Sequence, residues 1–150
     1  MQARLIIDGS YRLARLHEGI WVELAVLAGG AHAVLPDGRP VDQAALETAI
    51  DHAEDWLMPH AVALRGAELE VIEAVGRLDA GLQDVFSSDS RQWDTAQLES
   101  LFQQLDYMTA RPHLAASLEG HRETVAAIVL LRELAHHGKL ERVWLRDKVL

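Results

Sequence analysis

The chain has 150 residues, of which 49% are hydrophobic and 25% are charged, and it contains no cysteine. This length and composition are ordinary for a globular protein, so we expect a single domain over residues 1–150. The lack of cysteine excludes a disulfide framework, a thiolate metal site and a cysteine nucleophile. No apolar stretch approaches the roughly 20 residues that span a bilayer, and Asp8 comes too early for a signal peptide. The sequence therefore predicts a cytoplasmic protein of bacterial type that makes no membrane contact.

The acidic residues are unevenly distributed along the chain. The net charge is −9, and residues 42–106 carry fourteen acidic side chains against three basic ones. Nucleic acid is not an expected partner, because phosphate backbones are bound by clustered lysine and arginine. A protein with a basic surface would instead be attracted to this acidic middle third.

The first forty residues are typical of short β-strands separated by turns. The apolar or alternating runs cover residues 3–8, 11–17, 20–27 and 31–35. In residues 20–27 every second side chain is aliphatic (Ile20, Val22, Leu24, Val26) and the others include Trp21 and Glu23, which gives the period of two of a half-buried strand. Turn signals between the runs include Asp8-Gly9-Ser10 and Gly29-Gly30. Such short connections predict an antiparallel meander of three or four strands.

Two later segments carry helix-start signals. Asp42 precedes an amphipathic pattern that runs to about Met58, where Pro59 ends the helix. Asp94, with Gln97 three residues later, forms a variant of the capping box and starts a second helix.

Two other segments are ambiguous. Residues 67–75 and residues 140–150 fit either a helix or a strand, because their apolar residues satisfy both periods. For the first of them, the spacing of apolar residues across 60–90 favours a helix.

The longest regular apolar run lies in residues 124–137. Seven consecutive apolar residues continue into helix-forming ones, which predicts a helix in the middle of the core, with Ile128 and Leu131 almost fully buried. Gly138 is expected to end this helix in the left-handed conformation. The whole pattern, strands first and helices afterwards, predicts an α+β fold in which the meander is covered by about four helices.

Histidine and carboxylate side chains are the candidates for chemistry. Glu133 and His136 have the E-x-x-H spacing of carboxylate-bridged metal bundles, but the motif occurs once where such bundles need it twice, so no metal and no cofactor are expected. Asp51 and Asp55 are one turn apart on the first predicted helix and could bind a hard cation or exchange a proton, and His52 adds a group that titrates near neutrality. The weak catalytic candidates are therefore His52, Asp51 and His136. No serine nucleophile motif and no phosphate-binding glycine motif is present.

The leading functional interpretation is a non-enzymatic protein-interaction module. Glu47, Asp51, Glu54 and Asp55 lie mainly on one side of the first predicted helix and are the predicted partner-binding residues. The partner would be a protein with a basic surface, or a second copy of the chain. In size, acidity and absence of cysteine the chain looks like small acidic helper proteins such as secretion chaperones or immunity proteins. The alternative is a small enzyme or ligand-binding domain with a pocket, lined by histidine and carboxylate groups, between sheet and helices.

Overall fold

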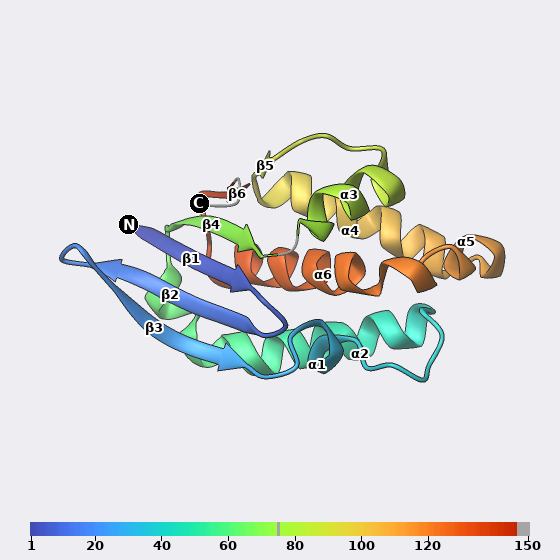
Figure 1. Ribbon diagram of the computed structural model, residues 1–150, viewed down its shortest axis with the longest axis horizontal. Coiled ribbons are helices and arrows are strands. Elements are labelled where there is room, and N and C mark those ends of the chain that lie inside the picture. Colours follow the sequence, from blue (N-terminus) through green and yellow to red (C-terminus); the bar gives the residue numbers. More distant parts are fainter. Residues whose placement is uncertain (75, 147–150) are drawn as a thin grey trace.

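A computed structural model describes residues 1–74 and 76–146. Within these residues, six strands form one mixed sheet and six α-helices pack around it (Figure 1). The strands are β1 (Gln2–Ile7), β2 (Tyr11–His17), β3 (Ile20–Leu27), β4 (Glu68–Glu73), β5 (Gln92–Trp93) and β6 (Arg142–Leu145). The α-helices are α1 (Ala31–Val34), α2 (Gln43–Leu57), α3 (Arg77–Phe86), α4 (Thr95–Thr109), α5 (Pro112–Ala116) and α6 (Arg122–His137). Short 3₁₀ turns cover Met58–His60, Val62–Leu64 and Glu119–His121.

The sheet has the strand order β3-β2-β1-β4-β6-β5. The first three strands pair antiparallel as predicted, and the α+β class is confirmed. The prediction of a simple meander is wrong, however, because β4 runs parallel to β1 and β6 runs parallel to β4, while β5 pairs antiparallel with β6. The prediction of about four helices is also too low. The sheet is completed by strands that come from much later in the sequence.

Two of these added strands, β4 and β6, come from the two ambiguous segments. Residues 68–73 form β4, so the helix favoured there is wrong. Leu69 and Val71 enter the core, and Glu70 on the other face is only 7% exposed because Arg4 pairs with it and Arg146 lies 3.2 Å from it. With a neighbouring strand on both edges, the backbone of β4 finds hydrogen-bond partners that override its helical spacing. Residues 142–145 form β6; residues 75 and 147–150 lie outside the described part of the chain.

The predicted strand at residues 31–35 is instead the short helix α1. Gly29 and Gly30 adopt positive φ angles of 85° and 51°, which turn the chain out of β3. A Cβ atom at Gly30 would lie 3.2 Å from the Cα of Ser10, so this connection packs directly against the turn between β1 and β2. The two turns therefore meet at one end of the sheet.

Both predicted helix caps are confirmed. The Asp42 side chain accepts a hydrogen bond of 2.8 Å from the backbone N–H of Ala45 at the start of α2. At the start of α4, Asp94 and Gln97 exchange two side chain–backbone hydrogen bonds, each of 2.8 Å. Each cap satisfies backbone donors that the first helical turn leaves free.

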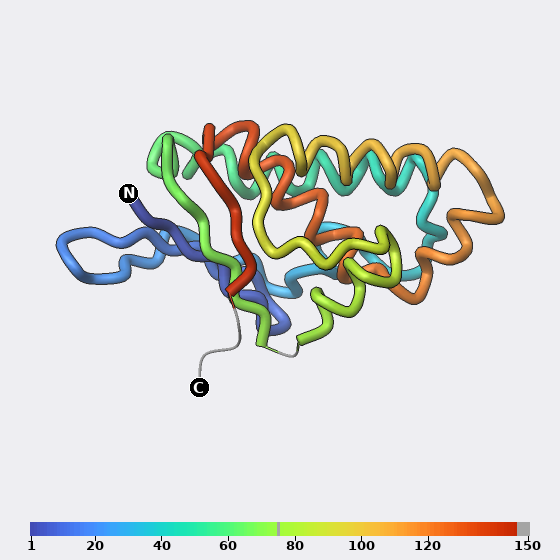
Figure 2. The backbone as a smooth tube through the Cα atoms, turned by 90° about the horizontal axis from the view of Figure 1, so that it is seen from above, coloured from blue at the N-terminus to red at the C-terminus, as the bar shows by residue number. Residues whose placement is uncertain are grey.

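Helix α6 is the centre of the core, as predicted. Ile128 and Leu131 are both 0% exposed, and α6 packs against α1, α2, α3 and α4. Figure 2 shows the helices gathered beside the sheet, which lies toward one end of the molecule. No described helix is long and apolar enough to cross a membrane.

The last helix ends at Gly138 as predicted, but the left-handed conformation predicted for this glycine is wrong. Its φ is −81°, and the left-handed conformation falls on Lys139, with φ 48°. A glycine is required at position 138 because there is no room for a side chain. A Cβ atom would come within 2.7 Å of the Leu134 carbonyl oxygen and 3.3 Å of the Leu64 Cβ. Close packing against the Val62–Leu64 turn therefore explains this glycine.

Candidate functional site

A cleft opens at the end of the sheet where the parallel strands β1 and β4 have their carboxyl ends. Ile7 pairs with Glu73 in the sheet, so Asp8 and Glu73 leave it side by side. The cleft consists of two adjoining hollows of about 280 and 470 Å³, which share His32, Arg77 and Glu123. Ligands of open α/β sheets bind at the carboxyl ends of parallel strands, so this strand-end cleft is the candidate site.

The floor of the smaller hollow is the turn between β1 and β2. Gly9 has a φ of 90°, and the Ser10 hydroxyl donates a 2.8 Å hydrogen bond to an Asp8 carboxylate oxygen. Gly30 closes against this turn from the start of α1. Because Gly9 is exposed and has no side chain, a ligand can approach the main chain closely here.

One wall is the first part of α3. The Glu73 carboxylate accepts a 2.8 Å hydrogen bond from the backbone N–H of Leu78, which caps this helix. A Cβ atom at Gly81 would lie 1.8 Å from the Thr124 hydroxyl oxygen, so α3 touches α6 at this point. The contact places Arg77 beside the cleft, where its guanidinium lies 3.5 Å from the Glu123 carboxylate.

The opposite wall is held by Arg122. Its guanidinium lies 2.8 Å from the Glu119 carboxylate and 3.4 Å from that of Asp37, and it donates hydrogen bonds to the carbonyl oxygens of Pro36 and Arg39. These contacts tie the loop at residues 36–39 to the start of α6. The contacts of Arg122 therefore stabilise the wall, whereas the guanidinium of Arg77, at the mouth of the cleft, makes a long ion pair of 3.5 Å with Glu123.

Tyr11 lines the smaller hollow as a buried polar group. It is 1% exposed, and its hydroxyl has no hydrogen-bond partner among the residues that the structure describes. Burial raises the pKa of Tyr11 above its usual value, and the negative charge of Glu123 raises it further. The phenol therefore stays neutral and remains a hydrogen-bond donor.

Carboxylates outnumber cationic groups in the lining of the cleft. The acidic residues are Asp8, Asp37, Glu73, Asp84, Glu119 and Glu123, the basic ones are Arg77 and Arg122, and His32 and His121 add two imidazoles. An anionic ligand is repelled by this surplus of negative charge unless a cation binds with it.

The catalytic residues predicted from the sequence are not brought together, and none of them lines this cleft. His52 is half-buried, with Nδ1 3.1 Å from the Val34 carbonyl oxygen, while Asp51 and His136 are exposed. Of the predicted partner-binding residues of α2, Glu47, Asp51 and Asp55 are exposed and Glu54 is half-buried beside α6.

In the sequence, Asp8-Gly9-Ser10 is recognisable only as a turn, and its pattern does not indicate that these residues line a cleft. The available signal was a carboxylate at the end of a strand, since Asp8 directly follows β1 and Glu73 is the last residue of β4. That signal becomes informative only when the two strands are known to be parallel neighbours, since only then do their ends meet.

No family model matches the sequence, and no curated protein matches it. Several solved structures share its fold. The crystal structure of the Aquifex aeolicus member of the Ppx/GppA protein family aligns with a TM-score of 0.63 and 11% identity, over 97% of this chain and 52% of the other. A structure of the Aquifex aeolicus PPX-GPPA enzyme aligns with a TM-score of 0.66 and 10% identity, over 97% of this chain and 53% of the other. The type II variant of the Aquifex aeolicus Ppx/GppA phosphatase aligns with a TM-score of 0.59 and 12% identity, over 98% of this chain and 54% of the other.

The chain thus spans about half the length of these structural neighbours, and at this identity the likeness concerns the fold. It overturns the interpretation of the chain as a non-enzymatic interaction module, because the fold recurs in proteins described as enzymes and phosphatases. The alternative, a small enzyme or ligand-binding domain with a pocket lined by histidine and carboxylate groups, is better supported.

Proposed function

We propose that this chain binds the phosphate groups of a phosphorylated substrate in the strand-end cleft and takes part in their hydrolysis. The observation that carries the proposal is the position of the cleft, at the carboxyl ends of β1 and β4, in a fold shared with a protein described as a phosphatase. The exposed backbone of the turn at Gly9 and the guanidinium of Arg77 are suited to phosphate oxygens.

Because the lining is acidic, phosphate is expected to bind together with a metal ion. Asp8 and Glu73 supply carboxylate oxygens of the kind that Mg²⁺ prefers, and a bound Mg²⁺ would offset the repulsion between phosphate and the lining. Glu123 is the carboxylate best placed to orient and deprotonate a water molecule, because it is exposed in the cleft and its ion pair with Arg77 is 3.5 Å long. Tyr11 adds a neutral hydrogen-bond donor.

Binding is tested with inorganic tripolyphosphate in the presence of Mg²⁺, by isothermal titration calorimetry. We expect Arg77→Gln to weaken binding by about tenfold, since a hydrogen bond to a charged group contributes about 1.5–3 kcal/mol. The matched control is Arg65→Gln, an exposed arginine that does not line the cleft. If wild type fails to bind at millimolar concentration, or if both variants weaken binding equally, the proposed phosphate site is wrong.

Hydrolysis is tested separately, because the chain covers only about half of its structural neighbours. Phosphate release from tripolyphosphate, a nucleoside triphosphate and p-nitrophenyl phosphate distinguishes anhydride from ester substrates. We expect Glu123→Gln to lower the rate by about 10²-fold or more, the usual effect of losing a general base, while tripolyphosphate binding persists. Binding without phosphate release by the wild-type chain would contradict the hydrolytic part of the proposal and leave the binding part supported.

A further inference from the structure

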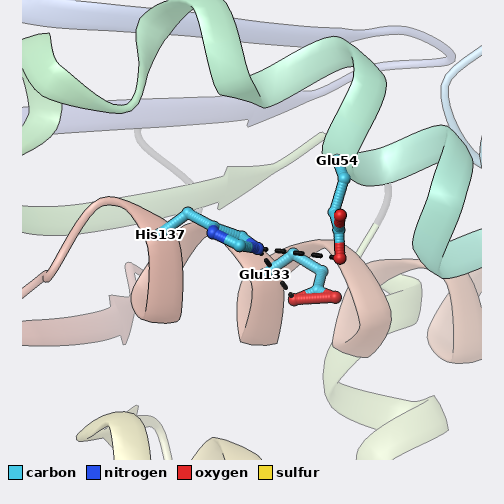
Figure 3. A group of neighbouring side chains, drawn as sticks. All are labelled: Glu54, Glu133 and His137. Carbon is cyan, nitrogen blue, oxygen red and sulfur yellow. Dashed lines mark ion pairs between the residues drawn. The ribbon is translucent and has the colours of Figure 1, made fainter.

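A second group of charged side chains lies between α2 and α6, away from the strand-end cleft. Glu54 of α2 faces Glu133 and His137 of α6, and the three side chains point toward one another (Figure 3). We propose that these three residues form a binding site for a divalent transition-metal ion of the zinc type. This inference is independent of the proposed phosphate chemistry.

The geometry of the three residues suits a single ion. Glu133 and His137 are one helical turn apart on the same side of α6, and Glu54 approaches from the neighbouring helix. His137 Nε2 lies 3.7 Å from a Glu54 carboxylate oxygen and 3.8 Å from one of Glu133. Ligand atoms of a tetrahedral zinc ion, each about 2.0–2.2 Å from the metal, are about 3.4 Å apart. All three ligand atoms lie within 4.8 Å of one another, so side-chain rotations without any backbone movement would complete the coordination.

The charges of this cluster are not balanced. Glu133 is 2% exposed, and its carboxylate lies 3.2 Å from the guanidinium of Arg132, which also pairs with Glu99 at 2.7 Å. Two carboxylates, those of Glu133 and Glu99, thus share one guanidinium, while Glu54 adds a third negative charge beside Glu133. A buried carboxylate beside another one needs a proton or a cation, and a divalent ion would balance both charges.

The donor set indicates the class of ion. Two carboxylates and one imidazole provide three protein ligands and leave a fourth position for water, as in open zinc sites. An imidazole nitrogen favours zinc and neighbouring transition metals over Mg²⁺ and Ca²⁺, which prefer oxygen alone. An ion can reach the site from solvent, because the side chains of His137 and Glu54 are 24% and 40% exposed.

The expectation of no metal rested on pairing Glu133 with His136. In the fold, His136 is exposed, and His137 turns toward Glu133 instead. The third ligand comes from α2, where Glu54 had been assigned to the partner-binding side. Two adjacent histidines therefore differ in their role, which provides a matched pair of variants.

The test uses the untagged full chain after treatment with a chelator. Calorimetric titration with Zn²⁺ is expected to show one ion per chain, and Co²⁺ is expected to give visible absorption bands of a low-coordinate site. His137→Ala and Glu54→Gln should each weaken Zn²⁺ binding by more than about tenfold, since even residues that only support ligands contribute 10–100-fold. His136→Ala should bind as wild type does. Glu54 is half-exposed, so Glu54→Gln should keep its fold, which circular dichroism verifies.

Three results would overturn the proposal. Wild type that binds no stoichiometric Zn²⁺ at micromolar concentration would mean that Glu54, Glu133 and His137 form no metal site. Equal losses in His136→Ala and His137→Ala would mean that the assigned ligand is wrong. Zn²⁺ binding that disappears in Asp8→Asn and persists in His137→Ala would place the ion in the strand-end cleft.

Discussion

Shortening Leu131 to alanine tests whether α6 is the centre of the core. Leu131 is 0% exposed, and its helix packs against four others. The substitution removes three carbon atoms, whose transfer to water alone accounts for about 2.4 kcal/mol at about 0.8 kcal/mol each. Surrounding side chains relax only partly into the space, so the total loss of unfolding free energy is expected to be about 2–5 kcal/mol. This is a large fraction of the stability of an ordinary domain.

Urea unfolding followed by the fluorescence of the four tryptophans measures this loss. The midpoint should fall while the slope stays constant, and the melting temperature should drop by about 2–4 °C for each kcal/mol. Val62→Ala, at a side chain that is 82% exposed, is the control and should change stability by less than about 0.5 kcal/mol. A loss below about 1 kcal/mol in both Leu131→Ala and Ile128→Ala would refute the central position of α6.

Three further substitutions test local features, each by equilibrium unfolding. Gly81→Ala should destabilise the fold by about 1–3 kcal/mol, because the added Cβ collides with Thr124. Gly120→Ala, where a Cβ meets nothing within 4 Å among the described residues, should be nearly neutral, and equal effects would contradict the close approach of α3 to α6. Asp94→Ala should cost about 0.5–2 kcal/mol through loss of the α4 cap, whereas full stability would show that the cap contributes nothing. Tyr11→Phe should raise stability by about 1 kcal/mol, since it removes a buried hydroxyl without a partner among the described residues. In wild type, the raised pKa of Tyr11 means that stability falls as pH rises above about 10, and the variant should lose less stability there.

The sequence by itself determined the features that depend on neighbouring residues. The caps at Asp42 and Asp94 were predictable, because a cap joins a side chain to the backbone three residues later. The burial of Ile128 and Leu131 was predictable because a helix that is apolar on nearly all sides has to be covered. The antiparallel pairing of β1, β2 and β3 followed from short connections, which leave little choice of arrangement.

Tertiary structure decided the elements whose local pattern was ambiguous. The residues of β4 alternate as a strand does and are also spaced as a helix allows, and only the neighbouring strands β1 and β6 select the strand. Gly138 was misjudged for a similar reason. Its role depends on Leu64, which is distant in sequence and lies against the end of α6.

Both candidate sites also depend on the tertiary structure. Asp8 meets Glu73 because two strands far apart in sequence are parallel neighbours, and Glu54 meets His137 because α2 packs against α6. A sequence shows the spacing of residues along one helix, so it suggested Glu133 with His136 and could not show which histidine faces a second helix. The orientation of a helix about its axis is set by the side chains it buries, and that choice brings His137 to Glu54 and leaves His136 in solvent.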